Sequence, residues 1–269
     1  MTQHFVTTPL RFSVLQSTLA GLRFGRHIHR FGIVDSTQRY AVRLANEIDV
    51  DGTLVIADAQ SQGRGQRDNQ WSSPSETGVY LSVIVDHRTS PALLAAATGL
   101  ALVDAALTVG VPAGIKWPND LVVANGKAGG VLAEALTATR AIIGIGVNLI
   151  PPAKDQLDGR LPVMEPVGLW LPGATWGRED LVVAILRSLE RRLAMAEADS
   201  AALCEEFAQA DALKGRMVIL ETNGGRRSGT LVRSHPLEGV TLKDEAGRCE
   251  TYRAEWTRIV AVAEPACES

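Results

Sequence analysis

The sequence predicts an α+β protein in which a mixed β-sheet packed with helices is followed by a small β-rich domain. Strand-like runs and helical segments share the chain up to residue 213, whereas only short strands and hairpin turns follow. A length of 269 residues with 46% apolar residues allows a sizeable core in the larger part. We therefore expect one domain at residues 1–213 and a second at residues 214–269.

The first elements are expected from apolar periodicity. Alternation predicts a strand at His27–Val34, after which Asp35 or Ser36 suits the N-cap of a helix with apolar residues at helical spacing. A continuous apolar run predicts a buried strand at Gly52–Ala57, and alternation predicts another at Gly78–Asp86.

The middle of the chain combines a helix with closely spaced strands. Pro91–Val109 is rich in Ala and Leu and predicts a buried helix, although its length and apolar character approach those of a membrane span. Four strands are expected at Gly114–Trp117, Leu121–Val123, Ala128–Ala135 and Ala141–Val147. Residues 150–176 are rich in Pro, Gly and Asp and predict a loop, and two helices should follow at Arg178–Ala196 and Ala201–Ala212.

The C-terminal part predicts a small all-β barrel. Turn signals at Asn223-Gly224-Gly225 and Asp244–Gly247 separate short apolar runs. The expected strands are Met217–Glu221, Arg227–Ser234, Gly239–Lys243, Cys249–Ala254 and Thr257–Val262. Short strands at this spacing are typical of small barrels.

Composition limits the classes of function. A net charge of −3 and a pI near 6.0 give no general attraction to nucleic acid or to an anionic membrane. Cys204, Cys249 and Cys267 are scattered and form no CxxC pair, which argues against a disulfide framework or a zinc site and favours a reducing compartment. With no signal-peptide pattern at the N-terminus, we expect a cytoplasmic protein.

A long polar loop, Ala59–Thr77, is the first candidate functional segment. Its backbone amides, with Arg64 and Arg67, suit phosphate or carboxylate oxygens. A solvated arginine loop remains the alternative interpretation. Gly63 and Gly65 do not complete a dinucleotide fingerprint, because the third glycine would fall at Asp68.

A second segment brings two lysines close to a carboxylate. Lys116-Trp117-Pro118-Asn119-Asp120 joins two predicted strands, and Lys127 begins a nearly apolar, glycine-rich strand. A lysine in such a strand needs a partner or a solvent-lined cavity, and a lysine is a compact charge that suits phosphate oxygens. The alternatives are a β-turn with a surface lysine and an edge-strand lysine. Gly144 and Gly146 indicate either plain packing or the close approach of a ligand.

Together these segments resemble the biotin–protein ligase family, in family order and spacing across residues 35–148. The matching pieces are Asp35-Ser36-Thr37, Gln60 with Gly63-Arg64-Gly65, Asn69-x-Trp71-Ser72, Tyr80-Leu81-Ser82, Lys116-Trp117-Pro118-Asn119-Asp120, Gly126-Lys127 with Gly130-Val131-Leu132-x-Glu134, and Gly144-x-Gly146-Val147-Asn148. The resemblance implies the class II synthetase-like biotin/lipoate ligase fold with an SH3-like C-terminal domain. It resembles the monofunctional members, which lack an N-terminal DNA-binding domain.

The resemblance also implies a reaction and its substrates. Such enzymes use ATP with Mg²⁺ to activate biotin as biotinyl-5′-AMP, and then transfer biotin to a lysine of a biotin carboxyl carrier domain. It implies no dedicated protein metal site, no DNA or membrane partner, and a monomer or a homodimer.

The family's roles are carried to the matching positions. Catalytic roles fall to Lys127, Lys116 and Arg64, with Lys127 bridging the biotin carboxylate and the α-phosphate. The biotin-binding positions would be Ser36, Thr37, Gln60, Arg64 and Gly130. The nucleotide-binding positions would be Gly63, Gly65, Arg67, Trp71, Lys116, Asn119, Lys127 and Asn148.

Two positions depart from the family pattern. Gln38 stands where the family has asparagine, and Gln66 stands where its loop usually has a second arginine. Two other functions therefore stay open. One is a lipoate or octanoate ligase or transferase of the same fold, and the other is a non-catalytic biotin or adenylate sensor.

Overall fold

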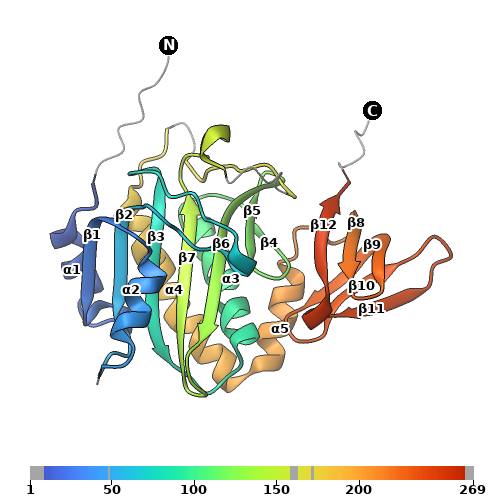
Figure 1. The fold of residues 1–269 in the computed structure, drawn as a ribbon, viewed down its shortest axis with the longest axis horizontal. Helices are drawn as coiled ribbons and strands as arrows, with labels where there is room; N and C mark the ends of the chain where they lie inside the picture. Colours follow the sequence, from blue (N-terminus) through green and yellow to red (C-terminus); the bar gives the residue numbers. More distant parts are fainter. Residues whose placement is uncertain (1–8, 48, 158–162, 171–172, 264–269) are drawn as a thin grey trace, which may run out of the picture.

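A seven-stranded mixed sheet forms the larger part of the molecule, seen in a computed structural model that describes residues 9–47, 49–157, 163–170 and 173–263 (Figure 1). In spatial order its strands are β1 (Ile28–Val34), β2 (Leu54–Gln60), β3 (Gly78–Asp86), β7 (Arg140–Asn148), β6 (Gly126–Ala135), β5 (Asp120–Val123) and β4 (Gly114–Lys116). β1 and β2 run parallel, and the other neighbouring pairs are antiparallel. The predicted mixed sheet is confirmed.

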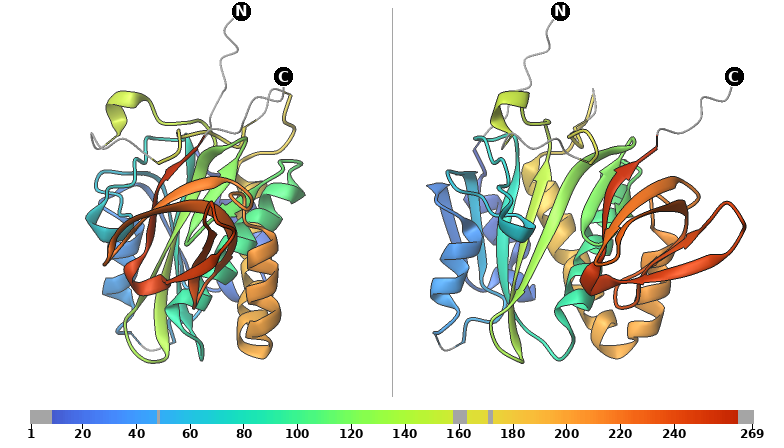
Figure 2. Two further views of the ribbon diagram at one scale, coloured as in Figure 1. Left: turned by 90° about the vertical axis from the view of Figure 1, so that its right-hand side faces the viewer. Right: turned by 45° about the vertical axis from the view of Figure 1, so that its right-hand side comes forward.

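Helices cover both faces of this sheet (Figure 2). On one face α2 (Thr37–Leu44) contacts β2, β3 and β7. On the other face α3 (Pro91–Thr108) packs against β4 to β7, with α4 (Arg178–Ala198) and α5 (Ser200–Gln209) against α3 and α1 (Phe12–Leu19) against α4. Successive residues of β2 face opposite sides of the sheet. Val55 packs under α2, whereas Leu54 and Ile56 belong to the main core on the other face.

The central helix α3 is apolar on nearly all sides because the sheet and two helices surround it. Its N-terminus is capped by Ser90, whose hydroxyl accepts a hydrogen bond from the Leu93 N–H at 3.3 Å, and Pro91 occupies the first helical position. By length and composition α3 could cross a membrane, but it has the same character as a core helix and most of its residues are buried inside the molecule. The predicted buried helix is confirmed.

The C-terminal strands form a separate five-stranded antiparallel sheet in the order β11-β10-β9-β8-β12. The strands are β8 (Met217–Thr222), β9 (Gly225–His235), β10 (Gly239–Lys243), β11 (Cys249–Arg253) and β12 (Arg258–Val262). β9 rests on α5, at the right of Figure 1. The small β domain expected from the turn spacing is present, but among the described residues its strands form an open sheet with β11 and β12 at its two edges, not the closed barrel that was predicted. Its boundary with the larger domain at residue 214 stays a prediction.

Several element bounds differ by a few residues from those expected, and two of the differences have a clear local reason. The second strand begins at Leu54 rather than at Gly52, because Gly52 has a φ of +77° and lies in a turn against the Arg23 carbonyl. The last helix ends at Gln209, because the next residues pair with β4 instead. The Ile115 N–H donates to the Ala210 carbonyl at 2.7 Å.

Candidate active site

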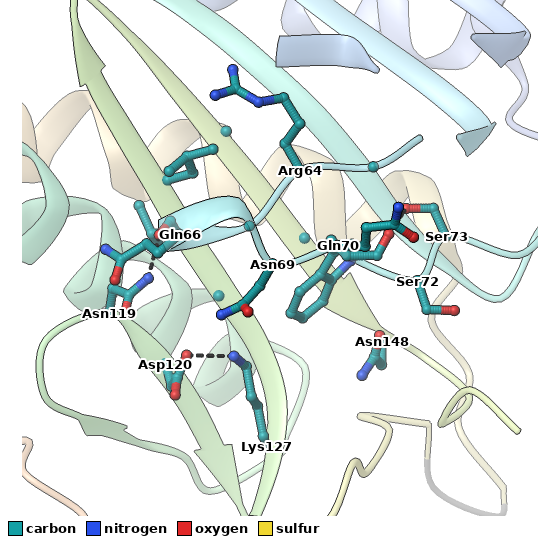
Figure 3. A pocket seen from close by; sticks show the side chains of 18 of the residues that line it. Arg64, Gln66, Asn69, Gln70, Ser72, Ser73, Asn119, Asp120, Lys127 and Asn148 are labelled. Carbon is teal, nitrogen blue, oxygen red and sulfur yellow. Dashed lines mark hydrogen bonds and ion pairs between the residues drawn. The ribbon is translucent and has the colours of Figure 1, made fainter. Parts of the chain in front are cut away.

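A cavity of about 850 Å³ opens beside β6 and β7 under the long loop of residues 61–77. Every residue assigned to catalysis or binding from the sequence lines it. These residues are Ser36, Thr37, Gln60, Gly63, Arg64, Gly65, Arg67, Trp71, Lys116, Asn119, Lys127, Gly130 and Asn148. They come from four strands, one helix and three connecting segments, so only the folded chain brings them together. Figure 3 shows Arg64 and Lys127 on opposite sides of the loop's short helical turn.

Asp120 joins the two lysines at one end of the cavity. Its Oδ2 lies 2.8 Å from Lys116 Nζ, and its Oδ1 lies 2.6 Å from Lys127 Nζ (Figure 3). β4 and β5 are neighbouring strands of a tight hairpin, and β6 is the next strand along. Lys127 therefore has the partner that a lysine in an apolar strand needs, and it belongs to a cluster of two cations and one anion.

The cluster has one buried cation and one accessible cation. The Lys116 side chain is only 8% exposed, whereas that of Lys127 is 33% exposed. Burial alone would raise the pKa of the Asp120 carboxyl, but the two ammonium groups lower it to about 2. Asp120 is therefore ionised near neutral pH and leaves a net charge of about +1 on the cluster, available to an anion.

The other end of the cavity is polar and uncharged. Gln60 Oε1 accepts hydrogen bonds from the Thr37 N–H at 2.8 Å and the Thr37 hydroxyl at 3.1 Å. Ser82 Oγ lies 2.9 Å from Thr37 Oγ1, and the Gln60 amide donates to Ser73 Oγ at 2.8 Å. These contacts fix the orientation of the Gln60 amide, whereas the Ser82 hydroxyl has a second acceptor, Gln38 Oε1, at 3.0 Å.

Ser36 occupies the N-cap position of α2, but the first N–H of that helix is satisfied by Gln60 instead. Among the described residues, no group forms a hydrogen bond with Ser36 Oγ, which is fully buried. The interpretation of Ser36 as only an N-cap is therefore incomplete. A buried hydroxyl that faces a cavity can form a hydrogen bond with a ligand.

Two glycines form a shelf for Trp71 across neighbouring strands. Gly130 of β6 pairs directly with Gly146 of β7. A Cβ at Gly146 would lie 2.5 Å from the Trp71 indole, and one at Gly130 would lie 3.5 Å from it. Lys127 Nζ lies 5.3 Å from the centre of the Trp71 ring. A protein side chain, rather than a ligand, makes the close approach at Gly146.

Gly144 serves Gln38 in the same way. A Cβ at Gly144 would lie 2.6 Å from Gln38 Oε1. The expectation that these glycines mark a ligand is corrected at both positions, because each accommodates a large side chain of this protein. Arg64, in the loop above, donates to both carboxylate oxygens of Glu134 at 2.9 Å.

The remaining predicted residues occupy the rim and the floor. Arg67 is exposed, and its φ of +54° places it in the left-handed region, where the loop changes direction. The Asn119 amide donates to the Val131 carbonyl and ties the β4–β5 turn to β6. Asn148, 5% exposed, lies at the end of β7 and its carbonyl accepts from the Leu169 N–H at 2.9 Å.

Sequence analysis missed several residues of the site. The sequence places Asp120 near the two lysines but assigns it no role in the site, whereas in the structure its carboxylate contacts both ammonium groups. Glu134 and Gln38 were quoted without roles. No local pattern pointed to Arg258–Val260 of β12, which reach the cavity from the C-terminal sheet. In the described residues, no cluster of three His, Cys, Asp or Glu side chains could hold a metal ion.

Comparisons with known proteins point to one family. Residues 31–148 match the model described as the "Biotin/lipoate A/B protein ligase family". The chain is 29% identical over 214 residues to a Mycobacterium tuberculosis "Biotin--[acetyl-CoA-carboxylase] ligase", covering 77% of this chain and 78% of that protein. It is 35% identical over 133 residues to the Bacillus subtilis "Bifunctional ligase/repressor BirA", covering 46% of this chain and 41% of that protein.

A solved structure shares the whole fold. The biotin protein ligase of Aquifex aeolicus, in complex with biotin and ATP, matches with a TM-score of 0.70 and 24% identity. The match covers 87% of this chain and 98% of that chain.

Proposed function

We propose that this chain, whose residues 31–148 belong to the biotin/lipoate A/B protein ligase family, is an ATP-dependent biotin–protein ligase. It activates biotin as biotinyl-5′-AMP and transfers the biotinyl group to a lysine of a carrier domain. The observation that carries this proposal is the cavity itself. A neutral hydrogen-bonding end at Thr37 and Gln60 and a cationic end at Lys127 face one space.

The first step joins two anions, and the cationic cluster suits it. A carboxylate oxygen of biotin attacks the α-phosphorus of ATP, a P–O bond forms, and pyrophosphate leaves with the electron pair of the broken bond. Lys127 is the exposed cation and would contact both anions, while Lys116 stays buried on Asp120. Each well-placed donor that stabilises the charge developing at the phosphorus lowers the activation free energy by about 3–4 kcal/mol.

The polar end would hold the ureido ring of biotin. That ring presents one carbonyl acceptor and two N–H donors, so its site needs both kinds of partner. The buried Ser36 hydroxyl would donate to the carbonyl, and Thr37 Oγ1 would accept from an N–H. Gly130, which has no side chain, leaves room for the carbon chain between the two ends.

The loop of residues 61–77 would cover the nucleotide. Gly63 and Gly65 bring its backbone close to the cavity, Arg67 supplies a cation, and Trp71 supplies an aromatic face beside Lys127. Covering the adenylate keeps water from hydrolysing it. Asn119 and Asn148 would contact the phosphates.

Mg²⁺ would enter as a complex with ATP rather than at a site built by the protein. Phosphate-bound Mg²⁺ needs only one or two protein oxygens. The cavity offers the ionised Asp120 carboxylate and the Asn148 amide oxygen, so the residues fit. When bound, Mg²⁺ would neutralise phosphate charge.

In the second step a lysine amine of the acceptor attacks the carbonyl of the mixed anhydride, an amide forms, and AMP leaves. The proposed acceptor is the carrier domain of a biotin-dependent carboxylase. The proposal includes no DNA partner, in line with the net charge of −3. It places the enzyme in the cytoplasm, as a monomer or a homodimer.

The test measures pyrophosphate release with Mg-ATP and either biotin or lipoate, first alone and then with a biotin acceptor domain. Biotin-dependent release, with label transferred to the acceptor lysine, is the expected result. Release with lipoate alone would reassign the chain to lipoate ligation. Biotin binding without release would make it a sensor and would overturn the proposal.

A further inference from the structure

Gln38 is a buried amide whose two ends contact different parts of the site. It is 3% exposed and lies in the first turn of α2. Its Nε2 donates to Glu134 Oε2 at 2.9 Å and lies 3.4 Å from the Ile142 carbonyl. Its Oε1 lies 3.0 Å from Ser82 Oγ. Because every neighbour of Nε2 is an acceptor, the orientation of the amide is fixed.

Through Glu134 this amide is connected to the loop over the cavity. Glu134 Oε2 accepts from both Gln38 and Arg64, and Glu134 Oε1 accepts from the second Arg64 nitrogen. The fork is a two-point attachment between the loop and β6. Both partners are only about one-third exposed, with fractions of 34% for Arg64 and 31% for Glu134. Gln38 therefore limits the rotation of the carboxylate that holds the loop.

Through Ser82 the same amide is connected to the polar end of the cavity. Ser82 has one hydroxyl proton and two candidate acceptors, Thr37 Oγ1 at 2.9 Å and Gln38 Oε1 at 3.0 Å. Thr37 already donates its own proton to Gln60. If Ser82 turns to Gln38, both lone pairs of Thr37 become available to a ligand N–H.

The backbone is shaped for this side chain. A Cβ at Gly144 would lie 2.6 Å from Gln38 Oε1, so a larger residue at position 144 would require the Gln38 side chain to shift from its present position. A buried amide needs hydrogen-bond partners wherever it lies, so the informative feature is which elements supply them. The contacts here come from β3, β6 and β7.

We propose that Gln38 is a positioning and specificity-determining residue with two effects. It orients the loop of residues 61–77 through Arg64, and it makes Thr37 Oγ1 available as a hydrogen-bond acceptor. It acts through Glu134 on the loop and through Ser82 on the N–H-binding hydroxyl. The ligand class follows from the chemistry, namely a cyclic urea with N–H donors beside an anionic tail. The effect on Thr37 rests on the proposed function, whereas the effect on the loop concerns the protein alone.

The first experiment needs no substrate. Trypsin cleavage after Arg64, located by mass spectrometry, is compared in the wild type, Gln38→Met and Glu134→Gln. Both variants should be cleaved about tenfold faster, as expected for the loss of a hydrogen bond to a charged group. Cleavage after Arg187, in α4, reports global unfolding and should not change. An unchanged rate after Arg64 in Gln38→Met would overturn the loop coupling.

The matched control is Gln209→Met, since Gln209 is an exposed glutamine whose amide also donates to a glutamate, at 3.3 Å from Glu205 Oε1. It should leave cleavage after Arg64 unchanged. If Gln38→Met lowers the stability of the whole protein, Gln38→Asn provides a second variant, which keeps the amide but is too short to reach Glu134. Gln38→Asn should raise the rate of cleavage after Arg64 about as much as Gln38→Met does. A wild-type cleavage rate in Gln38→Asn would contradict the coupling.

The second experiment uses biotin-dependent pyrophosphate release. Gln38→Met should raise KM for biotin about tenfold, with a smaller change in kcat. In the double variant with Glu134→Gln, the change in the free energy derived from KM should be smaller than the sum of the two separate changes. A KM equal to that of the wild type would overturn the effect on Thr37. A wild type without biotin-dependent release would instead reject the proposed function, and the proteolysis result would still decide the loop coupling.

Discussion

Asp120 determines the charge of the cationic end of the cavity. Its carboxylate lies between Lys116 and Lys127, at 2.8 and 2.6 Å. A single carboxylate cannot neutralise two ammonium groups, so the accessible lysine stays attractive to an anion. The same contact lowers the pKa of Asp120 to about 2.

That lowered pKa predicts a pH dependence of stability. The folded state favours the charged carboxylate, so its contribution is complete above the ordinary value of 3.8 and is lost as the pH falls to about 2. The difference corresponds to about 2 kcal/mol. Urea unfolding should show this loss in the wild type and not in Asp120→Asn, which should be less stable near neutral pH. Parallel pH profiles for the two proteins would contradict it.

Lys127→Ala should abolish most adenylation while preserving the fold. The rate of pyrophosphate release should fall by about 100-fold to 1,000-fold, because the variant lacks the exposed cation at the reacting oxygens. Asp120 keeps Lys116 as a partner, so the free energy of unfolding should change by about 1 kcal/mol or less. Lys243→Ala, at an exposed position on β10, serves as the control. Normal release by Lys127→Ala would rule out its proposed role.

At the scale of the elements, glycines in β6 and β7 let side chains of the protein lie against the sheet. The paired residues Gly130 and Gly146 accept the Trp71 indole, and Gly144 accepts Gln38. Trp71 belongs to the polar loop in sequence, but its indole lies against Gly130 of β6 and Gly146 of β7. The loop is therefore attached at Arg64 through Glu134 and at Trp71 through the glycine shelf.

This packing predicts a steric coupling between a strand and the loop. Gly146→Ala would place a Cβ 2.5 Å from the indole and should destabilise the protein by about 1–3 kcal/mol. In a Trp71→Ala background the same change should be nearly neutral. Urea unfolding of the four proteins measures the coupling, with Gly32→Ala as the control because nothing lies within 4 Å of its added Cβ. Additive effects would show that the indole does not rest on Gly146.

At the scale of the whole molecule, the C-terminal sheet contributes to the cavity formed by the larger domain. Arg258–Val260 of β12 line that cavity, and β9 rests on α5. The connection passes through Asp211, which pairs with β4 and whose Oδ1 accepts from the Leu213 N–H at 2.8 Å. Burial raises the pKa of Asp211 in spite of nearby polar groups.

Asp211→Asn should therefore stabilise the protein near neutral pH. A carboxyl with a raised folded pKa resists ionisation, so wild-type stability falls as the pH rises above 3.8. The amide keeps the acceptor for Leu213 and can donate to the buried Ser234 hydroxyl, which favours the variant by about 1 kcal/mol. Thermal unfolding near neutral pH and near pH 4 tests this, and the gain should shrink at the lower pH. A less stable variant near neutral pH would refute it.

Local sequence determined the elements and the identity of most of the site residues. Period-2 and continuous apolar runs fixed β3 and α3 to within a residue, because burial on both sides leaves a strong hydrophobic signal. The residues that line the cavity were found through a family resemblance that is concentrated in short motifs. Their types alone did not distinguish a site from a turn, an edge strand or an N-cap.

Tertiary structure alone decided the partners. Residues far apart in the chain meet only when the sheet assembles, as Gln38 does with Glu134 and as Trp71 does with Gly146. A glycine in a sequence shows that something comes close, but the fold determines whether that is a ligand or a side chain. The net charge at the cationic end of the cavity likewise depends on how Asp120, Lys116 and Lys127 meet, because electrostatic interaction depends on distance in space and on burial rather than on separation along the chain.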